Sequence, residues 1–84
     1  MVTNKIILSH LLKALDDMDF FALYPSRRSL QTYLKNAVSD SDKIRAILKD
    51  DIVQREIFPD ATLSGKEVDD PIKAYRTLVS QRHL

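Results

Sequence analysis

The sequence predicts an all-α fold: a small bundle of about four short helices in a single domain of 84 residues. Three observations lead to this prediction. Between Ile6 and Phe21, apolar side chains recur at the three- and four-residue spacing of an amphipathic helix. Residues typical of helix boundaries, such as Pro25 and the pair Asp70-Pro71, divide the rest of the chain into further segments. The alternation of apolar and polar residues that marks a half-buried strand is not found along the sequence.

The first helix is predicted over residues 4–19, and the other helices are expected to pack around it. Thr3 or Asn4 can cap its exposed amides. Carboxylates at positions 16, 17 and 19 oppose the helix dipole, so the helix is expected to fray or stop there. The residues that share its apolar face are Ile7, Leu8, Leu11, Leu12, Leu15 and Met18.

The second helix is predicted over residues 27–38. Pro25 disfavours the helical conformation at Tyr24, and Ser26 is expected to cap the helix that follows. Its buried side is expected to hold Leu30, Tyr33, Leu34 and Ala37.

The third helix is predicted over residues 42–56, after a run of capping residues that begins at Ser39. A regular helix would place Asp51 on its apolar stripe, so we expect a kink or a stop near Asp50. The stripe itself consists of Ile44, Ile47, Leu48 and Ile52.

The fourth helix is predicted over residues 71–82, with Asp70 as its cap and Pro71 at its first position. Residues 57–70 hold the only glycine, Gly65, and show no periodicity, which predicts a surface loop. The apolar face of the fourth helix is expected to hold Ile72, Tyr75, Leu78 and Val79.

The composition excludes several classes of protein. With 44% hydrophobic and 30% charged residues, the chain is typical of globular rather than disordered proteins. It contains no cysteine, which excludes disulfides, thiolate nucleophiles and cysteine-ligated zinc. No uncharged apolar run approaches the roughly 18 residues that a membrane span requires. We therefore expect a soluble cytoplasmic protein that has no membrane partner.

Residues suited to catalysis or metal binding are few. His10 lies at the edge of the first apolar face and His83 is the penultimate residue; neither has a second ligand at helical spacing. The aspartate clusters lack the register of a calcium-binding loop. The sequence therefore predicts no enzyme, no cofactor and no bound metal.

Charge is segregated along the chain, although the net charge is only +1. Residues 26–49 sum to +4, whereas residues 50–71 sum to −5. One interpretation is a basic binding face; the other is that the acidic segment folds back over the basic helices. The sequence leaves both interpretations open.

The apolar surface of the first helix exceeds what so small a domain needs, unless the other helices wrap that helix completely. This excess predicts a regulatory or adaptor protein that binds another protein, with a homodimer as one form of that association. The expected contacts are a charged face and an aromatic corner: Arg27, Arg28, Lys35, Lys43 and Arg45, with Phe20, Phe21 and Tyr24.

The alternative function is DNA binding through the second and third helices. Residues 25–48 loosely resemble the helix-turn-helix of winged-helix repressors, and Arg28 and Lys35 are types that contact phosphates. The connecting turn departs from that motif because it lacks glycine and carries Asp40 and Asp42. The isoelectric point of about 8.0 is also below the value of about 9 that is typical of basic nucleic-acid domains. A protein partner is therefore favoured over nucleic acid.

Overall fold

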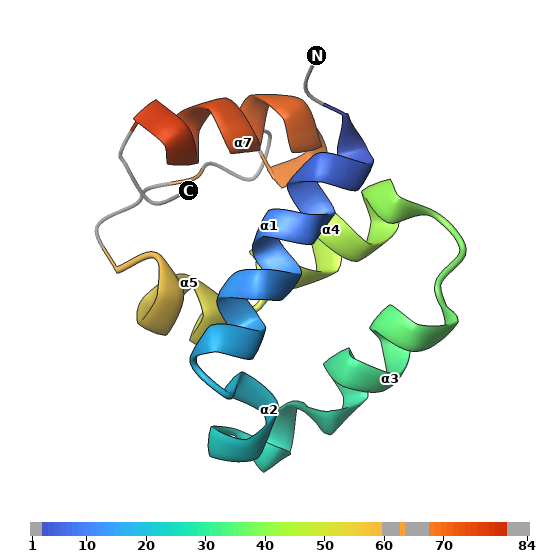
Figure 1. The fold of residues 1–84 in the computed structure, drawn as a ribbon, viewed down its shortest axis with the longest axis vertical. Helices are drawn as coiled ribbons and strands as arrows, with labels where there is room; N and C mark the ends of the chain where they lie inside the picture. The colour runs from blue at the N-terminus through green and yellow to red at the C-terminus, as the bar shows by residue number, and fades with distance from the viewer. Residues whose placement is uncertain (1–2, 60–62, 64–67, 81–84) are drawn as a thin grey trace.

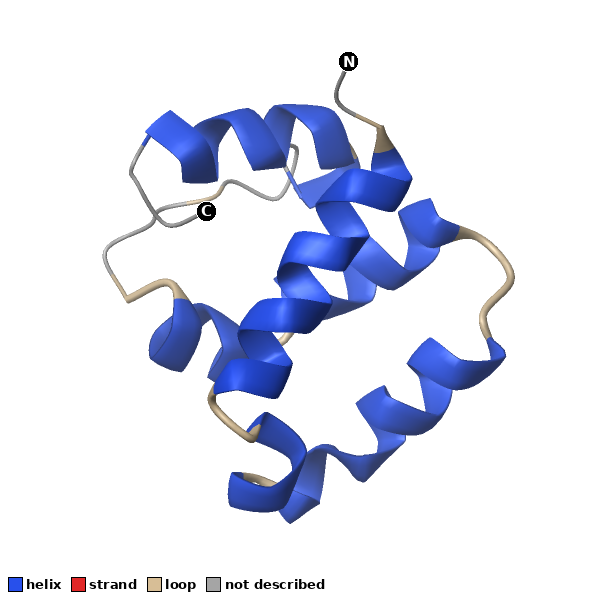
Figure 2. Ribbon diagram, in the orientation of Figure 1, coloured by secondary structure: helices blue, strands red, loops and turns tan. Residues whose placement is uncertain are grey.

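The computed structural model of the chain describes residues 3–59, 63 and 68–80. The protein is a small all-α domain, as predicted, and none of the described residues lies in a β-strand (Figure 2). Every helix in this part of the chain is too short or too polar to cross a membrane. The elements in chain order are α1 (Asn4–Asp17), α2 (Phe20–Leu23), the 3₁₀ turn η1 (Pro25–Arg27), α3 (Arg28–Asn36), α4 (Asp40–Lys49), α5 (Asp51–Ile57) and α7 (Pro71–Ser80).

The centre of the domain is the packing of α1 against α4 (Figure 1). α7 contacts both of these helices, α5 follows α4, and α2 and α3 form an arm that leaves the end of α1 and returns to α4. α1 is thus central, yet it still exposes about 40% of both Ile6 and Leu12. The largest fully buried side chains are Ile7, Leu11, Phe20, Ile44, Ile47, Leu48, Val53, Phe58 and Leu78.

Residues next to the two ends of α1 determine where the helix begins and ends. The Thr3 Oγ1 accepts a hydrogen bond from the Ile6 amide at 3.3 Å, which caps the helix as expected. The helix ends at Asp17, earlier than the predicted residue 19, among the carboxylates that oppose its dipole. Asp19 then adopts a left-handed backbone with φ of 55°, a conformation that Asp tolerates better than most residues, and the chain turns into α2.

The second predicted helix is shorter than residues 27–38. Pro25 opens the 3₁₀ turn η1, so α3 begins only at Arg28 and its N-cap position is Arg27, whose side chain makes no cap hydrogen bond. The prediction that Ser26 caps this helix is therefore wrong. Tyr33 is 45% exposed rather than buried, because α3 turns Leu30 towards the core instead.

The predicted helix over residues 42–56 is two helices. The Ser39 Oγ accepts from the Asp42 amide at 3.3 Å, so α4 begins at Asp40, earlier than predicted. The expected break near Asp50 is confirmed: its backbone is extended, and its Oδ1 accepts from the amides of Ile52 and Val53 at 2.9 and 3.1 Å. Asp50 therefore ends one helix and caps the next.

α7 starts where the sequence predicts, because the Asp70 Oδ1 accepts from the Lys73 amide at 3.3 Å. Its buried residues are Pro71, Ala74 and Leu78, whereas Ile72 and Val79, which were expected to be buried, are 38% and 41% exposed. The buried face of α7 thus follows the three- and four-residue spacing of positions 71, 74 and 78, and Ile72 and Val79 lie beside that face.

Two predicted segments, the end of the fourth helix and the loop before it, fall partly outside the residues that the structure describes. The described part of α7 ends at Ser80, and the predicted continuation to residue 82 lies outside the described residues. The loop was predicted over residues 57–70, but Ile57 belongs to α5. Residues 60–62 and 64–67 of this segment also lie outside the described residues.

A candidate protein-binding surface

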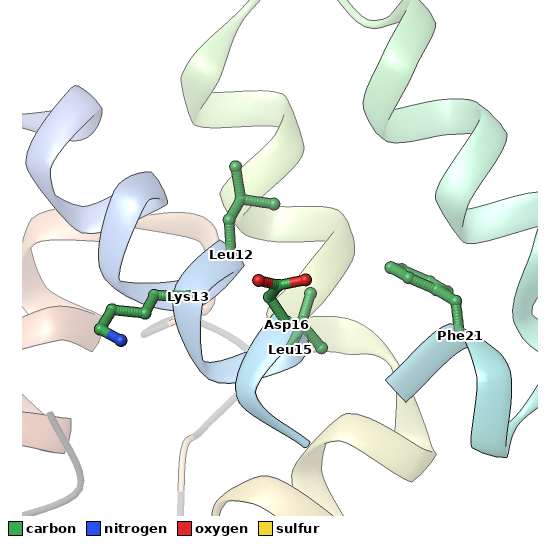
Figure 3. A pocket seen from close by; sticks show the side chains of 5 residues that line it. All are labelled: Leu12, Lys13, Leu15, Asp16 and Phe21. Carbon is green, nitrogen blue, oxygen red and sulfur yellow. The ribbon is translucent and has the colours of Figure 1, made fainter. Parts of the chain in front are cut away.

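The surface beside α1 and α2 contains two adjoining depressions, which together we call the α1–α2 hollow. The larger has a volume of about 400 Å³. The smaller, of about 340 Å³, shares Leu15, Asp16 and Phe21 with the first and extends to Gln31 of α3. The side chains that line the larger depression are Leu12, Lys13, Leu15, Asp16 and Phe21 (Figure 3).

The apolar part of the hollow comes from two helices that the turn at Asp19 brings together. Leu15 is buried at its base, whereas Leu12 is 40% exposed and Phe21 is half-buried. Figure 3 shows the Asp16 carboxylate between Leu12 and Phe21, while Lys13 points away from them. The hollow therefore combines accessible apolar atoms with one carboxylate in their midst.

The aromatic corner holds α2 in place. Phe20 is only 1% exposed, and its ring packs edge-on against Phe21 at a centroid distance of 5.2 Å. The half-buried Tyr24 packs on the other side of Phe20 at 5.1 Å. Of the aromatic residues predicted to contact a partner, Phe21 lines both depressions, and Phe20 borders the smaller one although its side chain is almost fully buried. Tyr24 is half-buried beside Phe20.

The border of the hollow on α1 and α2 is acidic. Asp16 and Asp19 both line it and are exposed, and no cation of the described residues lies within ion-pair distance of either. The nearby Lys13 does not neutralise them, because its Nζ pairs with Asp17 at 3.2 Å. This border therefore carries two unpaired negative charges.

The border on α3 is basic. Gln31 lines the smaller depression, and Arg28 and Lys35 lie three residues before and four residues after it, on the same side of the helix. Both cations are exposed, and neither has an ion-pair partner among the residues that the structure describes. The hollow is therefore acidic on its α1 and α2 side, and on its α3 side two cations flank Gln31, although neither Arg28 nor Lys35 itself lines a depression.

The other basic residues predicted to contact a partner do not join this border. Arg27 is half-buried, and its Nε lies 3.4 Å from the Asp50 Oδ2. Arg45 pairs with Asp42 and donates a hydrogen bond to the Ser41 Oγ at 2.8 Å. These two guanidinium groups are engaged within the domain. Lys43 lies half-buried on α4, apart from the residues that line the hollow.

Two ion pairs bear on the segregation of charge along the chain. Arg27 meets Asp50, and the Lys49 Nζ meets the Asp69 Oδ1 at 3.1 Å. At these points the acidic segment lies against the basic helices, as the second interpretation of the charge pattern holds. These pairs neutralise Arg27 and Lys49 but not Arg28 and Lys35. The basic surface is therefore smaller than the sequence suggests.

His10 has a structural contact. Its ring stacks on Tyr75 of α7 at a centroid distance of 5.7 Å, with the Nδ1 and the phenolic oxygen 3.3 Å apart. This pair joins the exposed sides of α1 and α7. Within the described ranges, no three His, Asp or Glu side chains gather closely enough to hold a metal ion.

The predicted contacts did not include seven of the residues that line the hollow: Leu12, Lys13, Leu15, Asp16, Asp19, Ala22 and Gln31. Leu12 was expected to be buried, and the two aspartates were interpreted only as helix-end residues. Their shared position depends on how the arm of α2 and α3 folds back on α1. A local sequence pattern does not carry that information.

Comparison of the chain with protein-family models, with curated proteins and with solved structures found no match.

Proposed function

We propose that the protein is a small non-catalytic binding domain, of the regulatory or adaptor type, that docks on another protein chain through the α1–α2 hollow. The observation that carries the proposal is the hollow itself, in which the accessible side chains of Leu12 and Phe21 flank the unpaired Asp16 carboxylate. The unpaired Asp19 lines the smaller depression, and the α3 cations flank Gln31, which also lines it. An apolar centre with a polar border is the usual anatomy of a protein interface. A cytoplasmic location belongs to the same proposal, and the cysteine-free sequence is compatible with it.

The chemistry of the hollow defines the partner segment that fits it. An apolar side chain would enter beside Leu12 and Phe21, and burying one of leucine size is worth about 2 kcal/mol. A cation on one side of that anchor would meet Asp16, and an anion on the other side would meet the α3 border. Exposed charges of this kind set orientation and rate more than affinity.

Selection from a displayed random-peptide library tests the proposal. We expect peptides selected on the wild-type chain to lose binding by about tenfold or more when Phe21→Glu places a charge in the hollow. The matched control is Leu23→Glu, since Leu23 lies on the same helix, is 61% exposed and does not line the hollow. Peptides that bind equally well to both variants, or that lose binding equally with both, would contradict the proposal.

DNA binding is the second candidate, and one observation favours it: Arg28 and Lys35 are exposed and unpaired within the described part of the chain. The helix-turn-helix geometry argues against it. The second helix of that motif reads the major groove, but on α4 Arg45 pairs with Asp42, Lys49 pairs with Asp69, and Lys43 is half-buried. The first turn of α4 also carries acidic side chains, where a phosphate would lie. Of the two helices of that motif, α3 is the one whose cations are exposed and unpaired within the described part of the chain.

Fluorescence anisotropy of a labelled random-sequence duplex separates the two candidates. Under the proposed function we expect no binding at about 50 or about 200 mM salt. Binding that falls steeply between these salt concentrations, and that Arg28→Glu with Lys35→Glu abolishes, would replace protein docking with DNA binding. Circular dichroism of the double variant would show whether its helices remain intact.

A further inference from the structure

We infer that the partner seated in the hollow is a second copy of this chain, related to the first by a two-fold axis through the hollow. The inference rests on the proposed docking site and adds the identity of its occupant. It depends on one feature of the hollow: the two borders carry unpaired charges of opposite sign, Asp16 and Asp19 on one side and the α3 cations on the other.

A two-fold axis that runs along the hollow, between its two borders, brings each border of one copy against the opposite border of the other copy. In such an isologous interface, if one residue contacts a second residue across the axis, the second contacts the first in the same way. The acidic border of each copy therefore meets the basic border of its partner, and this contact occurs twice. Near the axis, the Phe21 side chains of the two copies would exclude water from one another, while Leu12 and Asp16 of α1 lie to one side of it. The chain thus carries its own electrostatic complement.

The charges beside the hollow are not neutralised within the described part of the chain, so they can pair with a second copy. Lys13 forms an ion pair with Asp17, and Lys49 forms one with Asp69, both within a single chain. Asp16, Asp19, Arg28 and Lys35 have no such partners among the described residues, and they include both signs of charge.

The test uses the full chain and two variants with reversed borders. The acid-reversed variant carries Asp16→Lys and Asp19→Asn; Asn at position 19 tolerates the left-handed backbone. The base-reversed variant carries Arg28→Glu and Lys35→Glu. By sedimentation or light scattering we expect a wild-type dimer, and each variant alone should dimerise about tenfold more weakly or worse, because like charges then face each other twice.

Mixing the two variants in equal amounts provides the decisive measurement. In the mixed dimer, the reversed acidic border of one chain meets the reversed basic border of the other, and the two unaltered borders also meet. Dimerisation should therefore return in the mixture although it is weak in each variant alone. An exposed control, Lys73→Glu with Arg76→Glu on α7, changes the net charge as much as the base-reversed variant does and should dimerise like the wild type.

Three results would overturn the inference: a wild-type chain that stays monomeric at about 1 mM, a dimer that neither reversal weakens, or a mixture in which dimerisation does not return. The peptide selection keeps the inference distinct from the proposed function. If the chain is monomeric but selected peptides depend on Phe21, the hollow is a docking site for another protein and the two-fold dimer is refuted. If the chain is monomeric and no selected peptide depends on Phe21, both are refuted.

Discussion

Replacing Asp50 by Ala should remove the cap of α5 and the partner of Arg27 in one step. The Asp50 Oδ1 accepts the amides of Ile52 and Val53, while its Oδ2 lies 3.4 Å from the Arg27 Nε. The Asp50 side chain is only 8% exposed, so water does not readily replace these contacts. Because the residue joins α4, α5 and the turn η1, its loss should weaken the attachment of the whole arm of α2 and α3.

The expected magnitude follows from the two contacts. Loss of an N-cap acceptor costs about 1 kcal/mol. The Arg27 Nε is buried and lies within ion-pair distance of Asp50, but it lacks hydrogen-bond geometry, and the Arg27 side chain is 32% exposed. We therefore assign about 1 kcal/mol to the pair, nearer the value for surface pairs than for fully buried ones. The total of about 2 kcal/mol is a large share of the roughly 4–13 kcal/mol expected for a domain of this length.

Urea unfolding followed by far-UV circular dichroism measures this cost. We expect Asp50→Ala to lower the free energy of unfolding by about 2 kcal/mol and Asp50→Asn, which keeps a cap acceptor, by about 1 kcal/mol. The exposed neighbour provides the control: Asp51→Ala should change stability by no more than about 0.5 kcal/mol. If Asp50→Ala costs no more than Asp51→Ala, the cap and the ion pair do not stabilise the domain as described.

Further predictions concern the core and the turn, and each is checked by the same unfolding measurement. Ile47→Ala should cost about 3 kcal/mol, since Ile47 is 0% exposed, whereas Val38→Ala at a 99% exposed position should change little; a loss below 1 kcal/mol at Ile47 would contradict the packing of α4. Phe20→Ala should cost about 3–4 kcal/mol and Phe21→Ala less than half of that, because Phe20 is 1% exposed whereas Phe21 is only half-buried; equal costs would contradict this difference in burial. Asp19→Gly should raise stability by up to about 1 kcal/mol, since glycine adopts φ of 55° without strain; a clear loss of stability would show that Asp19 has another role.

The helix boundaries were the part of the fold most open to prediction. The start of α7 at Asp70-Pro71 and the break at Asp50 were both read from the sequence, because a cap hydrogen bond joins residues no more than three positions apart. The start of α3 was missed for an equally local reason. Pro25 favours the 3₁₀ turn that displaces the helix, and a sequence does not reveal whether the chain continues directly into an α-helix.

The faces of the outer helices were predicted less well. Tyr33, Ile72 and Val79 were expected to be buried, yet each is exposed by more than a third. Helical periodicity shows which residues share a face, but the packing of neighbouring helices decides how far that face turns inwards. The hollow was missed for the same reason, since Asp16 and Gln31 belong to helices that only the tertiary fold brings together.

The measurement that tests the central claim most directly is the amide NMR spectrum of the wild-type chain, recorded dilute and then concentrated. If a second copy docks in the hollow, concentration-dependent shifts should gather at Leu12, Asp16, Phe21, Gln31 and Lys35. Shifts confined to other surfaces, such as the exposed side of α7, or a spectrum that does not change with concentration, would contradict that claim.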